Sequence, residues 1–392
     1  MFDIGILATK KILVIFLVVL ILYYKILSLI FLENITDKEN FTSKFKAIKK
    51  GKKYLDQCNK GILIKRGIFP LSNIPKISII IPLYNTGERI KFIIRSIQNQ
   101  NIADIEILLI NDFSNDNNVT LHIIEKLKIE DQRIIIINNK NNMGILYSRC
   151  IGVLQSKGEY IMNLDHDDFI FDEDVFDTVY KAAKNGDFDI LSFTYITSKD
   201  YHLKVRSPRY ITLPHNYIVT QPRLSTYPLF KNDRFIYHDF TIWAKLYKNS
   251  TYKKAVHLLT YKRYSVFNAY NEDLIGLFTI CNVAKNYKYI RKIGVYHYDN
   301  SISASHVVKK DTKIFVDIFF TDIILDLAKK QYKKYGAIFL YGRINLSNNN
   351  NYNNQYLLKV IDKILLNKFI EEKYKKKIRL KFKKILEKCR LI

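Results

Sequence analysis

Short apolar runs alternate with stretches of helical periodicity between residues 76 and 164. Four runs have the length and the content of buried strands, at residues 76–82, 105–112, 133–138 and 160–164. Between them, apolar residues recur at helical spacing over 90–100, 119–127 and 145–155. This alternation predicts an α/β fold with a parallel sheet covered by helices on both faces.

Polar side chains follow the carboxyl ends of three predicted strands. Asn85 follows the first strand, Asp112 ends the second, and Asp165, Asp167 and Asp168 follow the fourth. In such sheets ligands bind beyond the carboxyl ends of the strands, so we expect these residues to line one crevice. Crowded carboxylates repel one another, and a divalent cation that shares phosphate oxygens would resolve the repulsion. The alternative is a polar turn in which Asp168 only caps a helix.

A mostly apolar segment at residues 12–32 is long enough to span a bilayer, which takes roughly 20 residues. Lys25 interrupts it near one end, where a lysine can reach the headgroups. No small-residue cleavage site follows, so the segment predicts an uncleaved single-pass transmembrane anchor rather than a buried core helix. Residues 33–75 are rich in lysine and are interpreted as a stem.

The orientation in the membrane stays open. Lysines after the apolar segment favour a cytoplasmic side, whereas the sequons at Asn34 and Asn40 favour a lumenal side. In a eukaryotic cell the anchor would place the protein in the ER or Golgi.

The alternation of strands and helices fades after about residue 200. Residues 201–310 are rich in aromatic side chains, and residues 311–392 form a basic helical extension. Within the extension, Lys359–Arg390 alternates lysines with apolar residues. A basic amphipathic helix lying on a membrane and a helical cap packed on the domain both fit this pattern.

The composition narrows the classes of partner. The chain has 392 residues, 48% of them apolar, and a formal net charge of +26. A charge of this size suits membrane surfaces, phosphorylated substrates or nucleic acid. No zinc-ligand spacing, helix-turn-helix or RNA-binding aromatic pattern is present, so nucleic acid is not expected. The four cysteines are too scattered for a disulfide framework or a metal cluster.

The motifs and their order resemble those of the family 2 glycosyltransferases, which have the GT-A fold. The resemblance covers about residues 76–175, through IIIPLYN at 79–85, LLINDFSNDN at 108–117, NNMGILYSRC at 141–150 and LDHDD at 164–168. Looser similarities follow in FTIWAKLYKN at 240–249, NEDLIGLF at 271–278 and YHYDNSISAS at 296–305.

The family implies a GT-A-type, mostly parallel sheet flanked by helices. Residues 76–200 would form the half that binds the nucleotide sugar, and residues 201–310 the acceptor-side half. The donor would be a nucleotide-diphosphate sugar, a UDP-sugar by default, used with Mn²⁺ or Mg²⁺. The acceptor would be a glycan, a lipid or a protein. The Gln-x-x-Arg-Trp motif of processive synthases is absent, which favours non-processive transfer.

The resemblance also implies roles for the donor site. Asp112 would accept hydrogen bonds from the nucleobase, with a helix-capping aspartate as the alternative. Asp167 would bind the cation. Asp165 would contact the ribose or a metal-bound water, and it is the second residue of the predicted metal site. The first-strand motif places Pro82, Tyr84 and Asn85 in the donor site. Arg149 is a candidate diphosphate contact, with a plain surface arginine as the alternative.

The segment NEDLIGLF at 271–278 contains the candidate general base. Asp273 would deprotonate the acceptor hydroxyl for an in-line attack that inverts the anomeric carbon, with Glu272 as second choice. Alternatively, the two carboxylates only open the following helix. A late histidine completes the metal shell in some GT-A enzymes, and His306 is considered for that role, but a lone histidine is more often structural and His306 is not included among the predicted ligands.

Two departures from the family pattern surround Asp112. Asn111 and Phe113 stand where the family usually has Asp and Gly, which is the sole support for an inactive GT-A-fold binding protein. A nucleotidyltransferase would need a Gly-rich phosphate loop after the first strand, and the segment at 83–87 does not supply one.

Overall fold

The computed structural model describes residues 74–198, 215–227, 230–231, 234–235, 241–259, 272–298, 310–328, 330–343 and 354–388. The predicted anchor at 12–32, almost all of the predicted stem and His306 lie outside these ranges. Within the described ranges, no helix combines the length and the apolar character that crossing a membrane requires.

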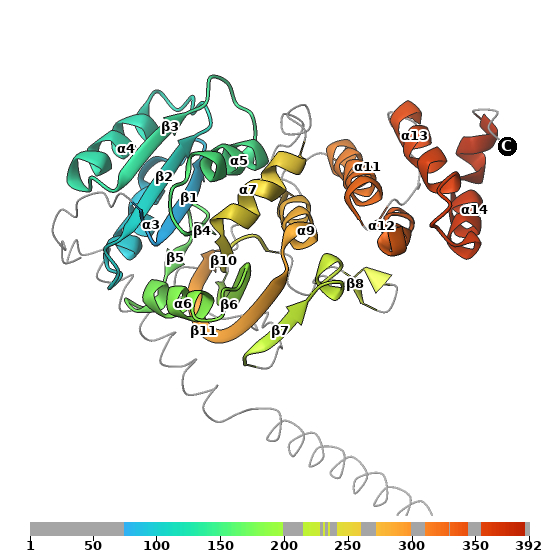
Figure 1. The fold of residues 1–392 in the computed structure, drawn as a ribbon. Coiled ribbons are helices and arrows are strands. Elements are labelled where there is room, and N and C mark those ends of the chain that lie inside the picture. Colours follow the sequence, from blue (N-terminus) through green and yellow to red (C-terminus); the bar gives the residue numbers. More distant parts are fainter. Residues whose placement is uncertain are drawn as a thin grey trace, which may run out of the picture. The chain divides into compact units, whose positions relative to one another are not determined.

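The first half of the main sheet is parallel, as the sequence predicts (Figure 1). Its strands, in spatial order, are β3 (Ile134–Asn138), β2 (Ile105–Asn111), β1 (Ile77–Leu83) and β4 (Tyr160–Asn163). The connecting helices are α3 (Ile90–Gln98), α4 (Val119–Glu130) and α5 (Ile145–Gln155). Every residue of β1 and β2 is buried, which explains their uninterrupted apolar runs.

The second half makes the sheet mixed rather than mostly parallel. The chain adds β5 (Phe169–Ile170), β6 (Ile190–Ser198), β7 (Tyr217–Thr220), β10 (Lys245–Lys248) and β11 (Asn286–Tyr298). Strand β10 inserts antiparallel between β4 and β6, and β11 runs parallel to β6 with β5 and β7 antiparallel to it. The expectation of a mostly parallel sheet is therefore wrong, because β10, β5 and β7 each pair antiparallel with their neighbours.

Further helices lie between the strands of the second half in the sequence. They are α6 (Val175–Lys184), α7 (Asn249–Leu258), α9 (Glu272–Val283) and the short 3₁₀ turns η1 (Gly87–Arg89) and η2 (Arg223–Ser225). A separate hairpin pairs β8 (Phe230–Lys231) with β9 (Arg234–Phe235).

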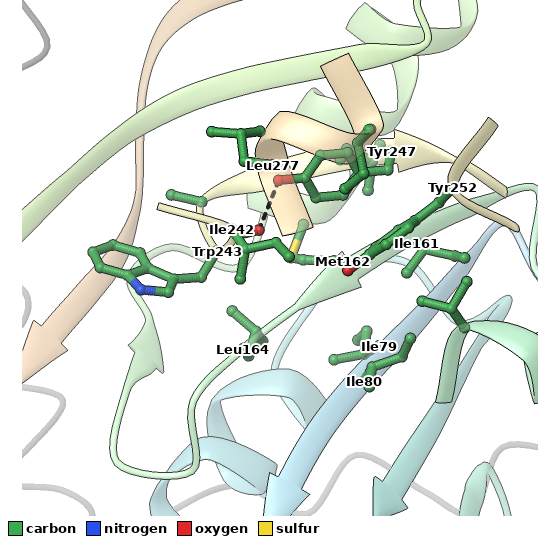
Figure 2. Packing of buried hydrophobic residues seen from close by; sticks show 14 of the residues in the cluster. Ile79, Ile80, Ile161, Met162, Leu164, Ile242, Trp243, Tyr247, Tyr252 and Leu277 are labelled. Atoms are coloured by element: carbon green, nitrogen blue, oxygen red, sulfur yellow. Dashed lines mark hydrogen bonds between the residues drawn. The ribbon is translucent and has the colours of Figure 1, made fainter. Parts of the chain in front are cut away.

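The main core joins the two halves of the sheet. Figure 2 shows side chains of β1 and β4 packed with Trp243, Tyr247 of β10 and Leu277 of α9. The Tyr247 hydroxyl donates a 2.9 Å hydrogen bond to the Ile242 carbonyl, so its polar atom is satisfied. Helix α5 lies close on β1, since a Cβ on Gly152 would approach Ile80 Cγ2 to 2.5 Å. This packing fixes where α5 presents its side chains.

The described residues beyond 310 are mostly helical. The elements are α11 (Lys310–Leu327), η3 (Lys330–Tyr332), α12 (Lys334–Arg343), α13 (Asn354–Leu365) and α14 (Glu372–Lys388). Helix α11 contributes to the main core and to a second core with α12, α13 and α14. Tyr374, Ile378 and Phe382 of α14 are buried in that second core. The apolar face of α14 thus packs inside the protein, which favours the helical-cap interpretation over a helix lying on a membrane.

Candidate active site

Two loops at the carboxyl ends of β1 and β2 are tied together by hydrogen bonds. The Asn85 backbone N–H donates to Ser114 Oγ at 3.0 Å, and its side chain exchanges hydrogen bonds of 2.7 and 2.8 Å with Asn115. The Tyr84 hydroxyl donates to Asn115 Oδ1 at 3.3 Å. Pro82 is buried inside β1, opposite Ile110 of β2. Of the predicted donor residues in this motif, Tyr84 and Asn85 therefore lie nearer solvent.

Asp112 organises the loop that leads into α5. Its carboxylate accepts hydrogen bonds of 2.8 Å from the backbone N–H groups of Met143 and Gly144 and from Asn139 Nδ2. The side chain is 4% exposed. Gly144 has a φ of 87°, which a glycine adopts without strain. The predicted nucleobase contact stays a prediction, and carboxylate oxygens retain lone pairs for further bonds.

Arg149 of α5 connects residues that are far apart in the sequence. Its side chain is 1% exposed, and Nη2 donates to Asp165 Oδ1 at 2.7 Å. The same nitrogen lies 3.9 Å from Glu272 Oε1 and 4.0 Å from Asp273 Oδ1, both in the first turn of α9. The surface-arginine interpretation is therefore wrong. The tertiary structure thus brings Glu272 and Asp273, the candidate general bases, close to Asp165, which was predicted to contact the donor.

Charge at this cluster is unbalanced, with three carboxylates around one guanidinium. Burial and the neighbouring Glu272 raise the pKa of Asp273 to about 8, although Arg149 pulls it down. Burial also raises the pKa of Glu272. Burial would raise the pKa of Asp165 as well, but the direct contact with Arg149 lowers it. Asp165 is thus the ionised partner, and Asp273 is the carboxylate that most readily holds a proton.

Several buried polar atoms of this edge lack a hydrogen-bond partner within the described part of the chain. They are Arg149 Nε and Nη1, Asp273 Oδ1 and Asp168 Oδ2. An unsatisfied buried polar group typically destabilises the fold by about 1–3 kcal/mol, so native proteins rarely gather several. These four atoms belong to residues connected through Asp165, and they are candidates for contacts with a polar ligand.

Asp168 pairs with a histidine that the sequence did not single out. Its Oδ1 atom lies 2.8 Å from His297 Nδ1 and accepts a 3.3 Å hydrogen bond from the Tyr298 backbone. The N-cap residue of α6 is Asp174, so the helix-cap interpretation of Asp168 is wrong. The His297 ring stacks on Trp243 with centroids 4.4 Å apart. Burial opposes a charge on this ring, but Asp168 raises the pKa of His297 to about 9.

This pair belongs to a group with metal-ligand geometry. Ligand atoms of Asp165, Asp168 and His297 all lie within 4.8 Å of one another. Carboxylate oxygens with an imidazole nitrogen form a donor set that suits Mn²⁺. The sequence prediction chose Asp165 and Asp167, and Asp167 lies on the same turn, partly buried. The missed signal was His297, the second residue of the YHYDNSISAS segment at 296–305.

The sequence of this chain is similar to those of known glycosyltransferases. Residues 78–255 match the family described as glycosyl transferase family 2. The cholesterol galactosyltransferase of Borreliella burgdorferi is 27% identical over 68% of this chain and 74% of its own length. The poly(ribitol-phosphate) β-N-acetylglucosaminyltransferase TarP of Staphylococcus aureus is 34% identical over 31% of this chain. That match spans 36% of TarP, and a match to the glycosyltransferase GlyG of Streptococcus pneumoniae spans 38% of GlyG.

Solved structures show the same fold. The crystal structure of residues 1–349 of TarS from S. aureus, in complex with UDP-GlcNAc, superposes with a TM-score of 0.58. The superposition covers 81% of this chain and 92% of that one at 16% identity. With the family match and the curated relatives, this identifies the mixed sheet as a GT-A fold. Residues 78–255 therefore form a domain of glycosyl transferase family 2.

Proposed function

We propose that this protein transfers a single sugar from a nucleotide-diphosphate donor to an acceptor hydroxyl, with inversion at the anomeric carbon. The observation that carries the proposal is the contact network of Arg149. It joins Asp165, at the carboxyl end of β4, to Glu272 and Asp273 at the start of α9. A donor carboxylate and a candidate base thereby share one site.

Asp273 acts as the general base in this proposal. Its Oδ1 atom is buried without a hydrogen-bond partner in the described structure, and its pKa of about 8 lies close to neutrality. A carboxylate with a raised pKa is a stronger base than an ordinary aspartate. It removes the proton of the acceptor hydroxyl, and the hydroxyl oxygen attacks the anomeric carbon. The bond to the nucleotide diphosphate breaks on the opposite face, so the configuration inverts.

Asp165, Asp168 and His297 are the residues that would hold a divalent cation, with Asp167 beside them as the ligand predicted from the sequence. The fit rests on the mutual distances within 4.8 Å and on Asp168 Oδ2, which is buried without a hydrogen bond in the described structure. When bound, Mn²⁺ or Mg²⁺ neutralises the charge of the departing diphosphate. The Asp168 carboxylate orients the His297 ring through Nδ1, which leaves Nε2 for a ligand.

The donor proposal is a UDP-hexose or UDP-N-acetylhexosamine. It is supported by relatives named as a galactosyltransferase and an N-acetylglucosaminyltransferase, and by a structural neighbour solved with UDP-GlcNAc. The acceptor names of these relatives include a sterol and a poly(ribitol-phosphate). A lipid hydroxyl and a glycan hydroxyl are therefore the first two acceptor classes to test, followed by protein.

The test is a donor screen with the full chain. UDP-, GDP- and dTDP-sugars are incubated with Mn²⁺ and with EDTA, and release of the nucleoside diphosphate is measured with and without acceptors. We expect Mn²⁺-dependent release that Asp273→Asn removes. Release that persists unchanged in Asp273→Asn contradicts the assignment of the base. Nucleotide binding without release, against every acceptor tested, would instead identify an inactive binding protein.

A membrane anchor at residues 12–32 remains part of the proposal. It is supported by the apolar length of the segment and by the lysines on both sides of it. Full-length protein should sediment with membranes after alkaline extraction, and a variant beginning at residue 74 should not. Extraction of the full chain into the soluble fraction would contradict the anchor.

A further inference from the structure

Phe113 has a backbone conformation that its side chain disfavours. Its φ is 60°, in the left-handed region, and it directly follows Asp112. Asparagine and glycine adopt this region readily, whereas a bulky aromatic residue there is an outlier. Several asparagines of the chain, among them Asn85 and Asn117, take the same conformation. Phe113 therefore occupies a position where the chain's own pattern would predict glycine or asparagine.

Packing does not account for the phenylalanine. Its side chain is 52% exposed, and it belongs to neither hydrophobic core among the described residues. A strained residue that buries little apolar surface is retained for something other than stability. Such outliers gather at ligand sites, where the rest of the structure holds them in place. Here Asp112, the preceding residue, is fixed by three hydrogen bonds.

Phe113 belongs to a loop that is hydrogen-bonded to the loop after β1. Tyr84, at the end of β1, is 45% exposed and bonds to Asn115, two residues after Phe113. Asn85 ties the same two loops through Ser114 and Asn115. Two partly exposed aromatic side chains therefore stand on adjoining loops at the carboxyl edge of β1 and β2, where a parallel sheet binds its ligand.

We propose that Phe113 is a stacking contact for the nucleobase of the donor. The inference rests on the proposed function, because the nucleobase comes with a nucleotide-diphosphate donor. An aromatic face stacks on any base and excludes water from it, and the strained backbone holds the ring at the edge of the site. Phe113 thus adds to the binding of the nucleobase, together with the hydrogen bonds predicted for Asp112.

The test measures UDP binding to the full chain by calorimetry in Mn²⁺. Phe113→Leu keeps the backbone strain and removes the aromatic face, Phe113→Gly removes both, and Phe113→Tyr keeps both. We expect Leu and Gly to weaken UDP binding about tenfold, within the range found for base stacking, and Tyr to bind like wild type. Inorganic pyrophosphate, which has no base, should bind all four proteins equally.

Thermal melting provides the control for folding. Phe113→Gly relieves the left-handed strain and should raise the Tm by about 2 °C, while Phe113→Leu should leave it unchanged. Weaker UDP binding in Phe113→Gly then cannot result from a less stable protein. Equal UDP affinity in wild type and in the Leu and Gly variants overturns the inference. Parallel losses for UDP and pyrophosphate overturn it too, because the site would be disturbed as a whole.

The two proposals fail in different ways. If the wild-type protein binds no nucleoside diphosphate, the proposed function falls and the stacking role falls with it. If wild type binds UDP and the Phe113 variants bind it equally well, only the stacking role is wrong.

Discussion

Two arginines of the parallel half of the sheet are equally buried, yet their surroundings differ. Arg133, just before β3, and Arg149, in α5, each expose 1% of the side chain. Arg133 pairs with Asp131 through two bonds, Nε–Oδ1 at 2.9 Å and Nη2–Oδ2 at 2.8 Å. Arg149 makes one hydrogen bond, to Asp165, and its Nε and Nη1 atoms have no partner among the described residues.

The difference separates a pair that stabilises the fold from a cluster that we propose as the ligand site. Burial alone would raise the pKa of Asp131, but Arg133 lowers it below its usual range. Beside Arg149, burial and Glu272 raise the pKa of Asp273 to about 8. One cation for one carboxylate satisfies the first site. At the second site one guanidinium faces three carboxylates. Carboxylate oxygens and guanidinium N–H groups therefore remain without hydrogen-bond partners among the described residues, an arrangement that favours catalysis and lowers stability.

The largest effect should follow from removing the base. Asp273→Asn should lower sugar transfer by about 10³-fold, because the acceptor hydroxyl loses its proton acceptor. UDP binding, measured by calorimetry, should not change. Glu272→Gln is the matched control and should retain more activity. Comparable losses in both variants would show that the two carboxylates act together and that Asp273 alone is not the base.

Replacing each of the two arginines by methionine tests the difference between their sites directly. Arg149→Met should lower transfer by about 10²-fold and the free energy of unfolding by only about 1–2 kcal/mol, because water can reach Asp165, which is 22% exposed. Arg133→Met should lower the free energy of unfolding by about 3–5 kcal/mol, because it leaves Asp131, 4% exposed, without its partner. Urea denaturation and initial rates measure both. If Arg133→Met impaired the activity of folded protein more than Arg149→Met did, the division would fail.

Substitutions at the proposed cation site test which side chains bind the metal ion. Asp168→Asn and His297→Ala should raise the Mn²⁺ concentration needed for half-maximal activity by about 10- to 100-fold. EDTA should abolish transfer by the wild-type protein, and added Mn²⁺ should restore it. Asp167→Asn tests the ligand that was predicted from the sequence alone, because Asp167 is not part of the group formed by Asp165, Asp168 and His297. An effect in Asp167→Asn without one in His297→Ala would favour the sequence-based pair.

The smallest effect should appear in the pH dependence. Because the pKa of Asp273 is raised in the folded state, the native protein keeps a proton that the unfolded chain has already released, so stability falls as pH rises from about 4 to about 8. Asp273→Asn should therefore gain stability over wild type at pH 8 relative to pH 5, by at least about 1 kcal/mol. Transfer by the wild type should rise with pH through the same range.

Asp131 should behave in the opposite way. Its lowered pKa means that its stabilising contribution is present above the unfolded pKa of 3.8 and is lost as the pH falls below it. Asp131→Asn should thus destabilise the protein at pH 7 and have less effect near pH 3. Denaturation curves at three pH values check both signs. The same pH dependence in the two variants would contradict the contrast.

Much of the donor half could be predicted from the sequence. All seven elements between residues 76 and 164 lie within a few residues of their predicted positions, because continuous apolar strands and helical periods are local signals. The antiparallel entry of β10 could not be predicted. The strand has four residues, Lys245–Lys248, and its place depends on pairing with β4 and β6 rather than on its own pattern.

The site divides in the same way. The sequence by itself determined the strand-end positions of Asn85, Asp112 and the carboxylates after β4, since strand ends follow from hydrophobic patterning. Only the tertiary structure decided that Arg149 is buried among Asp165, Glu272 and Asp273, and that His297 reaches Asp168. The contacts of Arg149 with α9 and of His297 with Asp168 join segments more than 100 residues apart. Nothing in the local sequence of either segment encodes its distance from the other. Burial and the balance of charge, which set the chemistry of the site, exist only once the chain has folded.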